Sequence, residues 1–423
     1  MKKYKFLEAI EVSRNVLYDF GFMCDSRTKS TYFTREGGNK LTFDGVILFV
    51  LNLVTKSLQI ELDNFFELIK KKGTSISKQG FSQARKKIKP EAFEKLFDTN
   101  VSWFYKSNNC QRFMGFRLLA IDASIMEIVN SQKLRDTFGA SKGNGKEHAR
   151  AMVSTIYDTE NDLFVKGLIT KFASCERAVA KQLIDSYAEI RLDNDLFLFD
   201  RGYPSKDFFL YLLKMKVNFI ARTQVNYYKS SIKEGVQDQM FELIEKGEIM
   251  HLRAIRFTLS SGKEELLITN VANSALGLEE FKQLYFKRWA IETKYDVLKN
   301  KIHIEKFAGA SQQTIKQEFF GALFLTNMAS IIKRESDELI VEDQREKNLK
   351  YEYQTNNNIL IGKLKDKIVC FMLEPRPRRR RKMYKQLLEE VQRNRTPIRP
   401  GRSFKRSKRL SANKSDFSQR SAL

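Results

Sequence analysis

Three acidic residues in this sequence occupy positions where a carboxylate can do chemistry. Asp122 ends the apolar run 117–122, Asp200 ends the run 196–200, and Glu292 lies in a later stretch with helical spacing. An acid at the end of a buried strand is unfavourable unless it has a role, and active sites of open sheets gather at strand ends. Three convergent carboxylates can hold two metal ions about 3.5–4 Å apart, which activate a water or a DNA 3′-hydroxyl. Taken singly, each aspartate is more typical of a turn or a helix cap.

The stretch around Glu292 contains no Pro or Gly from residue 278 to 302, which predicts one helix. At about 100° per residue, four chemically active side chains fall within an arc of about 60°: Tyr285, Arg288, Glu292 and Lys299. The alternative is a solvated face of i,i+4 salt bridges, which explains most helices of this composition. Asp296, one turn further on, is a rival carboxylate.

The composition favours magnesium over zinc as the metal. Oxygen-only ligands suit Mg²⁺ or Mn²⁺, and we expect two such ions. The four cysteines and three histidines are scattered, with no CxxC or Cys/His ligand spacing. Widely separated cysteines also indicate free thiols in a reducing compartment.

The elements that must position the acids form an alternating pattern. Strands are expected at 117–122, 151–158, 163–170, 196–200 and 217–222, with helices after Ser174 and after Pro204. This succession of three strands, helix, strand, helix and strand before the helix of Glu292 predicts a ribonuclease H-like α/β domain. Between Asp200 and Glu292, the runs 249–257 and 265–271 indicate an all-β insertion at about 223–276.

The four residues of the predicted helix resemble the Tyr-Arg-Glu-Lys motif of the DDE transposases of the insertion-sequence-four group. Residues 200–203 resemble that family's second-aspartate block, and residues 119–122 its first. The resemblance covers about residues 74–309, and the four-residue spacing is its specific part. Asp122 is followed by Ala-Ser, where the family often has Gly or Ser and then Thr.

The resemblance implies a ribonuclease H-like catalytic domain, a helical N-terminal DNA-binding domain and cut-and-paste transposition. It implies that Glu292 is the third metal ligand and that Tyr285, Arg288 and Lys299 contact the phosphate backbone of the transposon end. Some members stack a flipped base on a Trp of the β insertion. Because the only tryptophans here are Trp103 and Trp289, that role is vacant or falls to Tyr227, Tyr228 or Phe257.

Residues 1–115 are expected to be helical. Within them, the segment 74–88 opens with serines that can cap a helix, and Gln79, Arg85 and Lys86 could face DNA as in a helix-turn-helix reader. An ordinary exposed basic helix explains the same residues equally well.

The charge of the chain indicates a polyanionic partner. The net charge is +24 and the pI is near 9.7, which is typical of proteins that bind nucleic acid. No apolar run is long enough for a membrane span and no signal peptide is recognisable, so we expect a bacterial, cytoplasmic, nucleoid-associated protein. Residues 374–423 are strongly basic, and we expect 376–382 and 402–409 to stay largely unfolded and bind phosphate non-specifically, with a short helix at 383–391.

These features predict four parts: a helical DNA-binding domain at 1–115, a catalytic domain at 116–335, a helical region at 336–373 and a basic disordered tail at 374–423. The expected function is DNA transposition on double-stranded DNA, at terminal inverted repeats and target, by a chain that is a homodimer when assembled on DNA. The alternative is a non-enzymatic DNA-binding regulator or an inactive transposase remnant. A mere binder has no use for clustered carboxylates that repel DNA.

Overall fold

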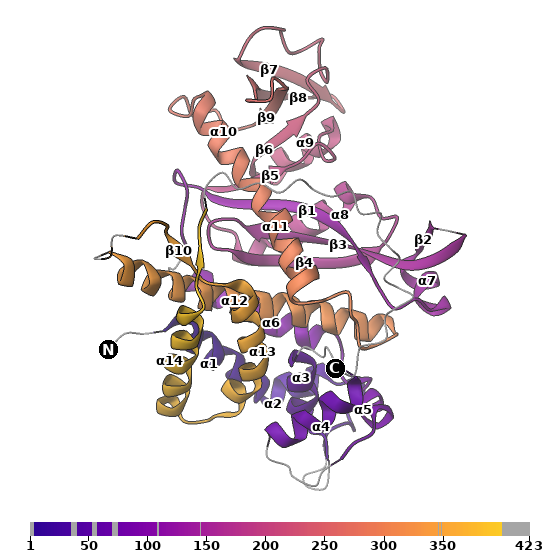
Figure 1. Cartoon of the computed structure of the whole chain (residues 1–423). Helices are drawn as coiled ribbons and strands as arrows, with labels where there is room; N and C mark the ends of the chain where they lie inside the picture. Colours follow the sequence, from indigo (N-terminus) through magenta and orange to yellow (C-terminus); the bar gives the residue numbers. More distant parts are fainter. Residues whose placement is uncertain are drawn as a thin grey trace. The chain divides into compact units, whose positions relative to one another are not determined.

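The computed structural model describes residues 4–34, 40–52, 57–69, 75–107, 110–143, 145–345, 347 and 349–399. The fold is mixed α/β, with one large mixed sheet and many helices (Figure 1). The chain forms two compact units. The helical unit comprises Met1–Lys106, Met126–Ala151 and Asp296–Leu423, and the sheet unit comprises Ser107–Ile125 and Met152–Tyr295.

The sheet unit holds most of the large sheet. Its strands run in the order β4-β3-β1-β5-β6-β9-β8-β7. Strands β1, β5 and β6 are parallel, and pairing from β6 through β9 and β8 to β7 is antiparallel. The bounds are β1 (Arg117–Glu127), β3 (Lys146–Asp158), β4 (Leu163–Lys171), β5 (Asp195–Phe199), β6 (Asn218–Thr223), β7 (Asp238–Glu245), β8 (Glu248–Thr258) and β9 (Glu264–Thr269).

A buried ion pair sits where β1 and β5 begin. Arg117, which is fully buried, bonds both carboxylate oxygens of Asp195, and the two residues are direct partners across the strands. The hydroxyl of Tyr187 donates to the same carboxylate at 3.0 Å. A buried charge is tolerated only when it is paired and hydrogen-bonded, so this pair favours one register. In that register Ala120 faces Leu198, and two residues further along each strand lie Asp122 and Asp200.

Helices α8 (Glu176–Ser186) and α9 (Lys206–Lys214) follow β4 and β5, with the short 3₁₀ turn η1 (Ala188–Ile190) between α8 and β5. The stretch predicted as one helix from 278 to 302 is helical but not uniform. It consists of α10 (Leu278–Phe286), the 3₁₀ turn η2 (Lys287–Trp289), α11 (Ala290–Asp296) and the π turn η3 (Val297–Lys301). A 3₁₀ turn is tighter than an α turn and a π turn is wider, so the ideal 100° step does not hold from Tyr285 to Lys299.

The helical unit is built from segments distant in sequence. Its elements are α1 (Lys5–Leu17), α2 (Phe20–Ser26), α3 (Phe43–Leu51), α4 (Leu58–Leu68), α5 (Lys78–Arg85), α6 (Glu91–Lys106), α7 (Gln132–Phe138), β2 (Ala140–Gly143), η3, α12 (Gln312–Gln344), β10 (Tyr353–Gln354), α13 (Asn357–Leu373), α14 (Pro377–Arg393) and β11 (Thr396–Pro397). Strand β2 pairs with the first residues of β3, and β10 pairs with β11.

Helix α12 is the centre of the helical unit. Ser311 caps its first turn by accepting a hydrogen bond from the Thr314 amide. Nearly every residue from Phe319 to Ile332 is buried, because α12 packs against α1, α3, α6, α13 and α14. A helix that is buried on all sides belongs to a core, and apolar burial of this kind is the main source of stability.

Residues 377–393 form α14, which differs from the unfolded segment expected at 376–382 and includes the short helix expected at 383–391. Pro377 occupies the first turn, where its missing amide costs nothing. Tyr384, Leu387, Leu388 and Val391 are buried at helical spacing, and α14 packs on α1, α12 and α13. The apolar stripe that predicted a short helix at 383–391 therefore extends the ordered region towards the arginines. The basic run 402–409 lies outside the described residues.

Candidate active site

Asp122 lies within β1, directly after the fully buried residues Leu118 to Ile121. Its side chain is 19% exposed. Its Oδ1 accepts a hydrogen bond from the amide of Ala123 at 2.9 Å. The fully buried run before it explains why this segment forms a central strand.

Asp200 follows the last residue of β5, whose five residues are all buried. Its Oδ1 accepts a hydrogen bond from the amide of Gly202 at 2.9 Å. Because β1 and β5 are parallel and in the register set by Arg117 and Asp195, both aspartates lie at the carboxyl edge of the sheet, where ligands bind in open sheets.

Glu292 is held next to Asp122 by a buried arginine. Arg288 is 3% exposed, and its Nη2 donates to Glu292 Oε1 at 3.0 Å while its Nη1 lies 3.9 Å from Asp122 Oδ2. Burial acts to lower the pKa of Arg288, but Tyr285, Asp122 and Glu292 raise it above its usual value. The alternative expectation was a solvated face of salt bridges. Arg288 is buried, so its pairing with Glu292 does not match that alternative.

Tyr285 is also buried, at 2% exposure, and its hydroxyl makes no hydrogen bond to the described residues. Burial raises its pKa, and the positive charges of Arg288 and Arg222 oppose that rise. The Arg288 guanidinium lies 5.9 Å from the Tyr285 ring centroid and 5.0 Å from that of Trp289. The arginine therefore rests on aromatic surface as well as on carboxylates.

Side chains of three residues hold α11 and η2 to the rest of the sheet unit. The Tyr295 hydroxyl donates to the backbone carbonyl of Asp122 at 2.9 Å and lies 3.0 Å from Thr155 Oγ1. Lys294 pairs with Asp162 at 2.8 Å, and Lys287 pairs with Glu160 at 3.1 Å. Tyr295, one turn after Glu292, thus positions the helix directly over Asp122.

The acids influence one another electrostatically. Burial raises the pKa of Asp122 to about 7, and the charge of Asp200 adds to this rise. Arg288 opposes the rise, and Glu292 adds a smaller increment in the same direction as Asp200. A carboxyl with a raised pKa beside two other acids is a frequent mark of a functional site. The three predicted acids are therefore electrostatic neighbours in the sheet unit.

The donor set suits a hard divalent cation, since it consists of carboxylate oxygens. Within the described ranges, no group of three or more acidic, His or Cys side chains is arranged to hold a metal ion. Arg288 pairs with Glu292 Oε1 and approaches Asp122 Oδ2. The residues fit Mg²⁺ or Mn²⁺ in chemistry, and Glu292 must leave Arg288 to become a ligand.

Two groups beside the acids were not found from the sequence. Glu176 begins α8, and its Oε2 lies 3.4 Å from the position that a Cβ on Gly202 would take. Tyr203 is fully buried, and its hydroxyl has no hydrogen-bond partner among the described residues. Tyr203 is the last residue of the second-aspartate block, but no role was predicted for it. Glu176 carries no signal in the sequence, because an acid in the first turn of a helix is commonplace.

The other residues singled out in the sequence around Glu292 and in the β insertion have varied surroundings. Lys299 belongs to the helical unit, where its Nζ lies 4.0 Å from Glu305 Oε1. Asp296, the rival carboxylate, is exposed and accepts a hydrogen bond from Asn300 at 2.6 Å. Of the stacking candidates, Tyr227 is 47% exposed, whereas Phe257 is buried at 4%. Tyr228 is intermediate, and burial raises its pKa to about 12.

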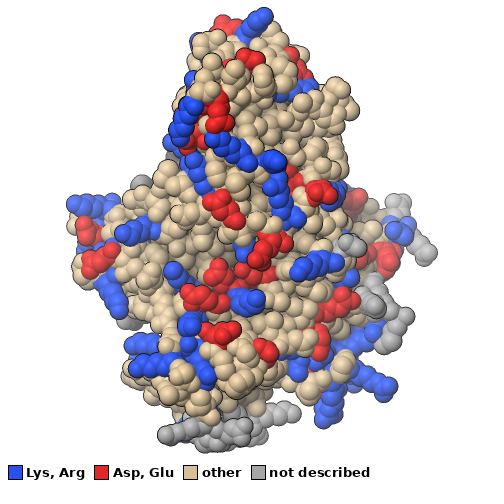
Figure 2. Space-filling view, turned by 180° about the vertical axis from the view of Figure 1, so that it is seen from behind, with Lys and Arg blue, Asp and Glu red and all other residues tan. Residues whose placement is uncertain are grey.

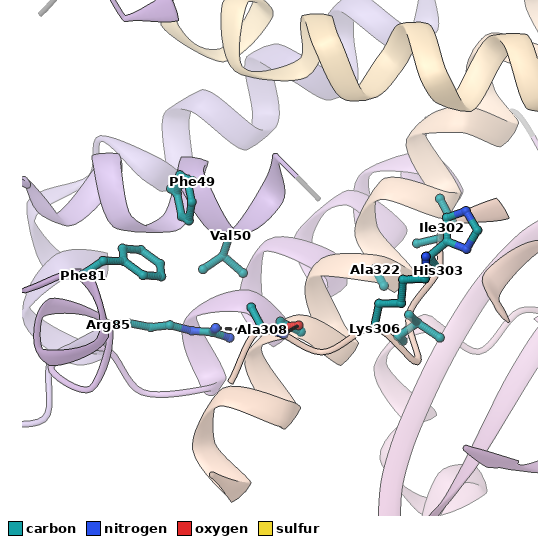
Figure 3. Close-up of a pocket in the computed structure, with 11 residues that line it drawn as sticks. Phe49, Val50, Phe81, Arg85, Ile302, His303, Lys306, Ala308 and Ala322 are labelled. Carbon is teal, nitrogen blue, oxygen red and sulfur yellow. Dashed lines mark hydrogen bonds and ion pairs between the residues drawn. The ribbon is translucent and has the colours of Figure 1, made fainter. Parts of the chain in front are cut away.

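Helix α5 carries the three residues that were expected to face DNA. Gln79 and Lys86 are exposed. Arg85 is 3% exposed, and its guanidinium bonds Gln317, Glu318 and the Thr314 carbonyl at 2.6–2.7 Å. Figure 3 shows it extending beside Ala308 at a small cavity of about 30 Å³. Arg85 therefore anchors α5 to α12, and only Gln79 and Lys86 are left free to meet a DNA surface.

Helix α14 presents a second basic surface in the helical unit. Its outward residues Arg378, Arg379, Lys382 and Lys385, which we call the α14 basic face, are all exposed. Arg380 points inward instead, pairing with Glu11 and donating to the Glu374 carbonyl. Elsewhere charges are mixed: the face in Figure 2 shows basic and acidic side chains interspersed. In the described part of the chain, no helix is both long and apolar enough to cross a membrane.

Comparisons with known proteins identify a family for this part of the chain. The family model described as "Transposase DDE domain" matches residues 114–328, more than half of the 423 residues, including Asp122, Asp200 and Glu292. Among solved structures, the chain is similar to one titled "Cryo-EM structure of piggyBac transposase synaptic complex with hairpin DNA", with a TM-score of 0.48 and 10% identity, over 93% of this chain and 87% of that one. A search of curated proteins finds no match.

Proposed function

The chain belongs to the transposase DDE domain family, and from this premise we propose that it carries out cut-and-paste DNA transposition. It cleaves phosphodiester bonds at the ends of a mobile element and joins those ends to target DNA. One observation carries the proposal: Asp122 and Asp200 lie level on two parallel strands, and Arg288 and Tyr295 hold the helix of Glu292 against Asp122.

We further propose that this member belongs to the insertion-sequence-four group and that its catalytic core is ribonuclease H-like. The spacing of Tyr285, Arg288, Glu292 and Lys299 supports the first point. The parallel strands β1, β5 and β6, joined to β3 and β4 in one sheet, support the second. Strands β7, β8 and β9 correspond to the proposed insertion, which in this chain continues the sheet from β6.

Asp122, Asp200 and Glu292 are the proposed ligands of two Mg²⁺ or Mn²⁺ ions. When bound, such ions activate the attacking water or 3′-hydroxyl and stabilise the charge that develops on the phosphate. Asp122 must be ionised to serve, and its raised pKa means that it gives up its proton near pH 7. Tyr295 keeps the backbone of Asp122 fixed while the side chains of the acids turn.

Arg288 is proposed to act in two states. In the metal-free protein its guanidinium neutralises Glu292 and approaches Asp122. A carboxylate beside a DNA backbone is repulsive unless a cation lies between them. When Glu292 turns to the metal, Arg288 is released to a DNA phosphate, in keeping with the backbone contacts that the motif implies for Tyr285, Arg288 and Lys299. The planar guanidinium suits both partners.

DNA binding is assigned to three surfaces. These are Gln79 and Lys86 of α5, the α14 basic face, and the basic residues beyond 399. The domains of the proposal are a DNA-binding part at 1–115, a catalytic part at 116–335, a helical part at 336–373 and a basic part at 374–423. We propose that the chain acts as a homodimer assembled on paired terminal inverted repeats, in the cytoplasm of a bacterial cell.

An excision assay in cells tests the proposal. A resistance marker is placed between the two DNA segments that flank the gene for this chain, and loss of the marker from the plasmid is measured. The wild type should excise the marker, and Asp122→Ala, Asp200→Ala and Glu292→Ala should each fail. If the wild type binds the flanks and represses transcription without excision, the alternative of a DNA-binding regulator or an inactive remnant is correct.

A further inference from the structure

Two neighbouring carboxylates of the sheet unit lack a positive partner. A Cβ built on Gly202 would lie 3.3 Å from Asp200 Oδ1 and 3.4 Å from Glu176 Oε2. Both oxygens therefore border the space left open by the missing side chain of Gly202. Within the described part of the chain, neither carboxylate forms an ion pair, and Asp200 accepts only the Gly202 amide.

This pair contrasts with the other two acids of the site. The Arg288 guanidinium pairs with Glu292 at 3.0 Å and lies 3.9 Å from Asp122. Among the described residues no ion pair is formed by Glu176 or by Asp200, although the charge of Asp200 acts on Arg288, and burial together with the charge of Asp200 raises the pKa of Glu176. Two like charges this close are unfavourable unless a cation binds between them.

A third group beside the pair also lacks a partner. Tyr203 has no exposed surface, and its hydroxyl makes no hydrogen bond among the described residues. Burial raises the pKa of this phenol well above its usual value, and the charges of Asp122, Glu176 and Asp200 add to the rise. Tyr203 directly follows Gly202 in the same turn, and its amide donates to the Asp200 carbonyl at 3.4 Å. A buried hydroxyl without a partner is rare in native proteins and often marks an absent water or ion.

We propose that Glu176 and Asp200 together bind one divalent cation, Mg²⁺ or Mn²⁺, in the space beside Gly202, with the Tyr203 hydroxyl as the third polar group there. Glu176 is then a fourth carboxylate of the metal site. Mg²⁺ is commonly held by only one or two carboxylates, which agrees with a site built from a pair. This inference rests on the proposed function, because Asp200 is shared with the catalytic acids.

The helix dipole explains in part why an acidic residue, Glu176, stands at the start of α8. Acidic residues stabilise helix N-termini through the helix dipole. That effect explains the residue type, but it does not explain why a second carboxylate, that of Asp200, borders the same space beside Gly202. Glu91 is a matched control, because it is also an exposed first residue of a helix, α6, and lies in the helical unit.

The test is a titration of the full chain with Mn²⁺ in the absence of DNA. The electron paramagnetic resonance signal of the free ion measures how much Mn²⁺ is bound. Glu176→Gln should lower the affinity for one Mn²⁺ ion by about tenfold or more, as the loss of groups that support a metal site commonly does. Glu91→Gln should bind as the wild type does. In EDTA, Glu176→Gln should unfold at the same urea concentration as the wild type or higher, which shows that a loss of Mn²⁺ binding is not a failure to fold.

Two further variants with small changes in side-chain size test the same proposed Mn²⁺ site. Tyr203→Phe removes only the hydroxyl, and Gly202→Ala puts a methyl group where the two carboxylate oxygens meet. Both should weaken the same Mn²⁺. With Fe²⁺ in place of Mn²⁺, hydroxyl-radical cleavage of the backbone should map next to residues 176 and 202.

The outcomes separate this inference from the function it rests on. If Asp200→Asn loses Mn²⁺ while Glu176→Gln keeps wild-type affinity, the fourth carboxylate is wrong and the three-acid site stands. If the wild type shows no saturable Mn²⁺ site, both are overturned. Loss of Mn²⁺ in Glu176→Gln, Tyr203→Phe and Gly202→Ala, but not in Glu91→Gln, establishes the fourth carboxylate.

Discussion

Replacing Asp122 by Asn should make the metal-free protein more stable at pH 8. Burial, and then the charge of Asp200, raises the pKa of Asp122 from 3.8 to about 7. A folded-state pKa above the unfolded value means that the folded protein holds the proton more tightly. The stability therefore falls as the pH rises from about 4 to about 7. Above that range the ionised carboxylate opposes folding, and Asn has nearly the same shape without the charge.

The size of the gain follows from the shift in pKa. A change from 3.8 to about 7 corresponds to about 4 kcal/mol at 1.36 kcal/mol per pKa unit. Asn also gives up the ion pair with Arg288, whose Nη1 lies 3.9 Å away. We therefore expect about 1–3 kcal/mol of added free energy of unfolding at pH 8. The gain should shrink below pH 7 and vanish below about pH 4, where the carboxyl is protonated in both states.

Urea unfolding in EDTA at pH 8, 6 and 4.5 measures this gain. Asp207→Asn is the control, because hydrogen bonds from Lys181 and then Lys246 lower the pKa of Asp207 to about 2. The same chemical change should leave stability unchanged or lower it there. A lower stability of Asp122→Asn than of the wild type at pH 8 would refute the reasoning, since it would mean that the ionised Asp122 is favourably paired.

Further predictions concern the groups that hold the site and the basic surface that would meet DNA. Arg288→Ala should lower the free energy of unfolding at pH 8 by about 3–5 kcal/mol, because it removes the buried cation that pairs with Glu292 and lies near Asp122; calorimetry showing no change would remove Arg288 from the account. Tyr295→Phe should cost about 0.5–1.5 kcal/mol in urea unfolding by removing the hydrogen bond to the Asp122 carbonyl, and a loss of Mn²⁺ affinity should accompany it. Arg117→Met should cost about 3–5 kcal/mol in the same assay by stranding the charge of Asp195. Neutralising the α14 basic face should reduce the slope of log Kd against log salt by up to about 0.9 for each DNA phosphate that the face no longer neutralises, and an unchanged slope would show that this face does not touch DNA.

The sequence contains a further indication that Asp122 and Asp200 lie side by side, which was not used in the prediction. The runs 117–122 and 195–200 each begin with a charged residue, continue with four apolar residues and end in Asp. The opposite charges of Arg117 and Asp195 indicate that the strands are neighbours, and their equal lengths bring Asp122 and Asp200 level. Because a one-residue slip turns every side chain to the other face of the sheet, this register decides whether the acids meet.

Other features depend on contacts that helical spacing does not encode. The edge shared by Tyr285, Arg288 and Glu292 followed from periodicity, but their burial did not, because it depends on packing against distant strands. The break in helical geometry at η2 and η3 has no Pro or Gly to announce it. Glu176 meets Asp200 only through the tertiary fold.

Charge counting led to the incorrect expectation that residues 377–382 are unfolded. Six of the seven residues from 376 to 382 are basic, a composition typical of an unfolded segment. Tyr384 and Leu387 nevertheless dock the helix on α1, α12 and α13, and Arg380 pairs with Glu11. Apolar contacts to a core thus outweighed local repulsion, which solvent screens.

The most direct test of the central claim is cleavage of DNA by the purified chain. The substrate is a duplex carrying the boundary between the element and its flanking DNA, labelled at one end, incubated with Mg²⁺ or with Ca²⁺. The account predicts nicks at the element boundary with the wild type in Mg²⁺. It predicts no nicks with the wild type in Ca²⁺ or with Asp200→Asn in Mg²⁺. In both reactions the protein should still bind the duplex. Cleavage by Asp200→Asn at the wild-type rate, or cleavage without a divalent cation, would contradict the assignment of these carboxylates as the catalytic metal site.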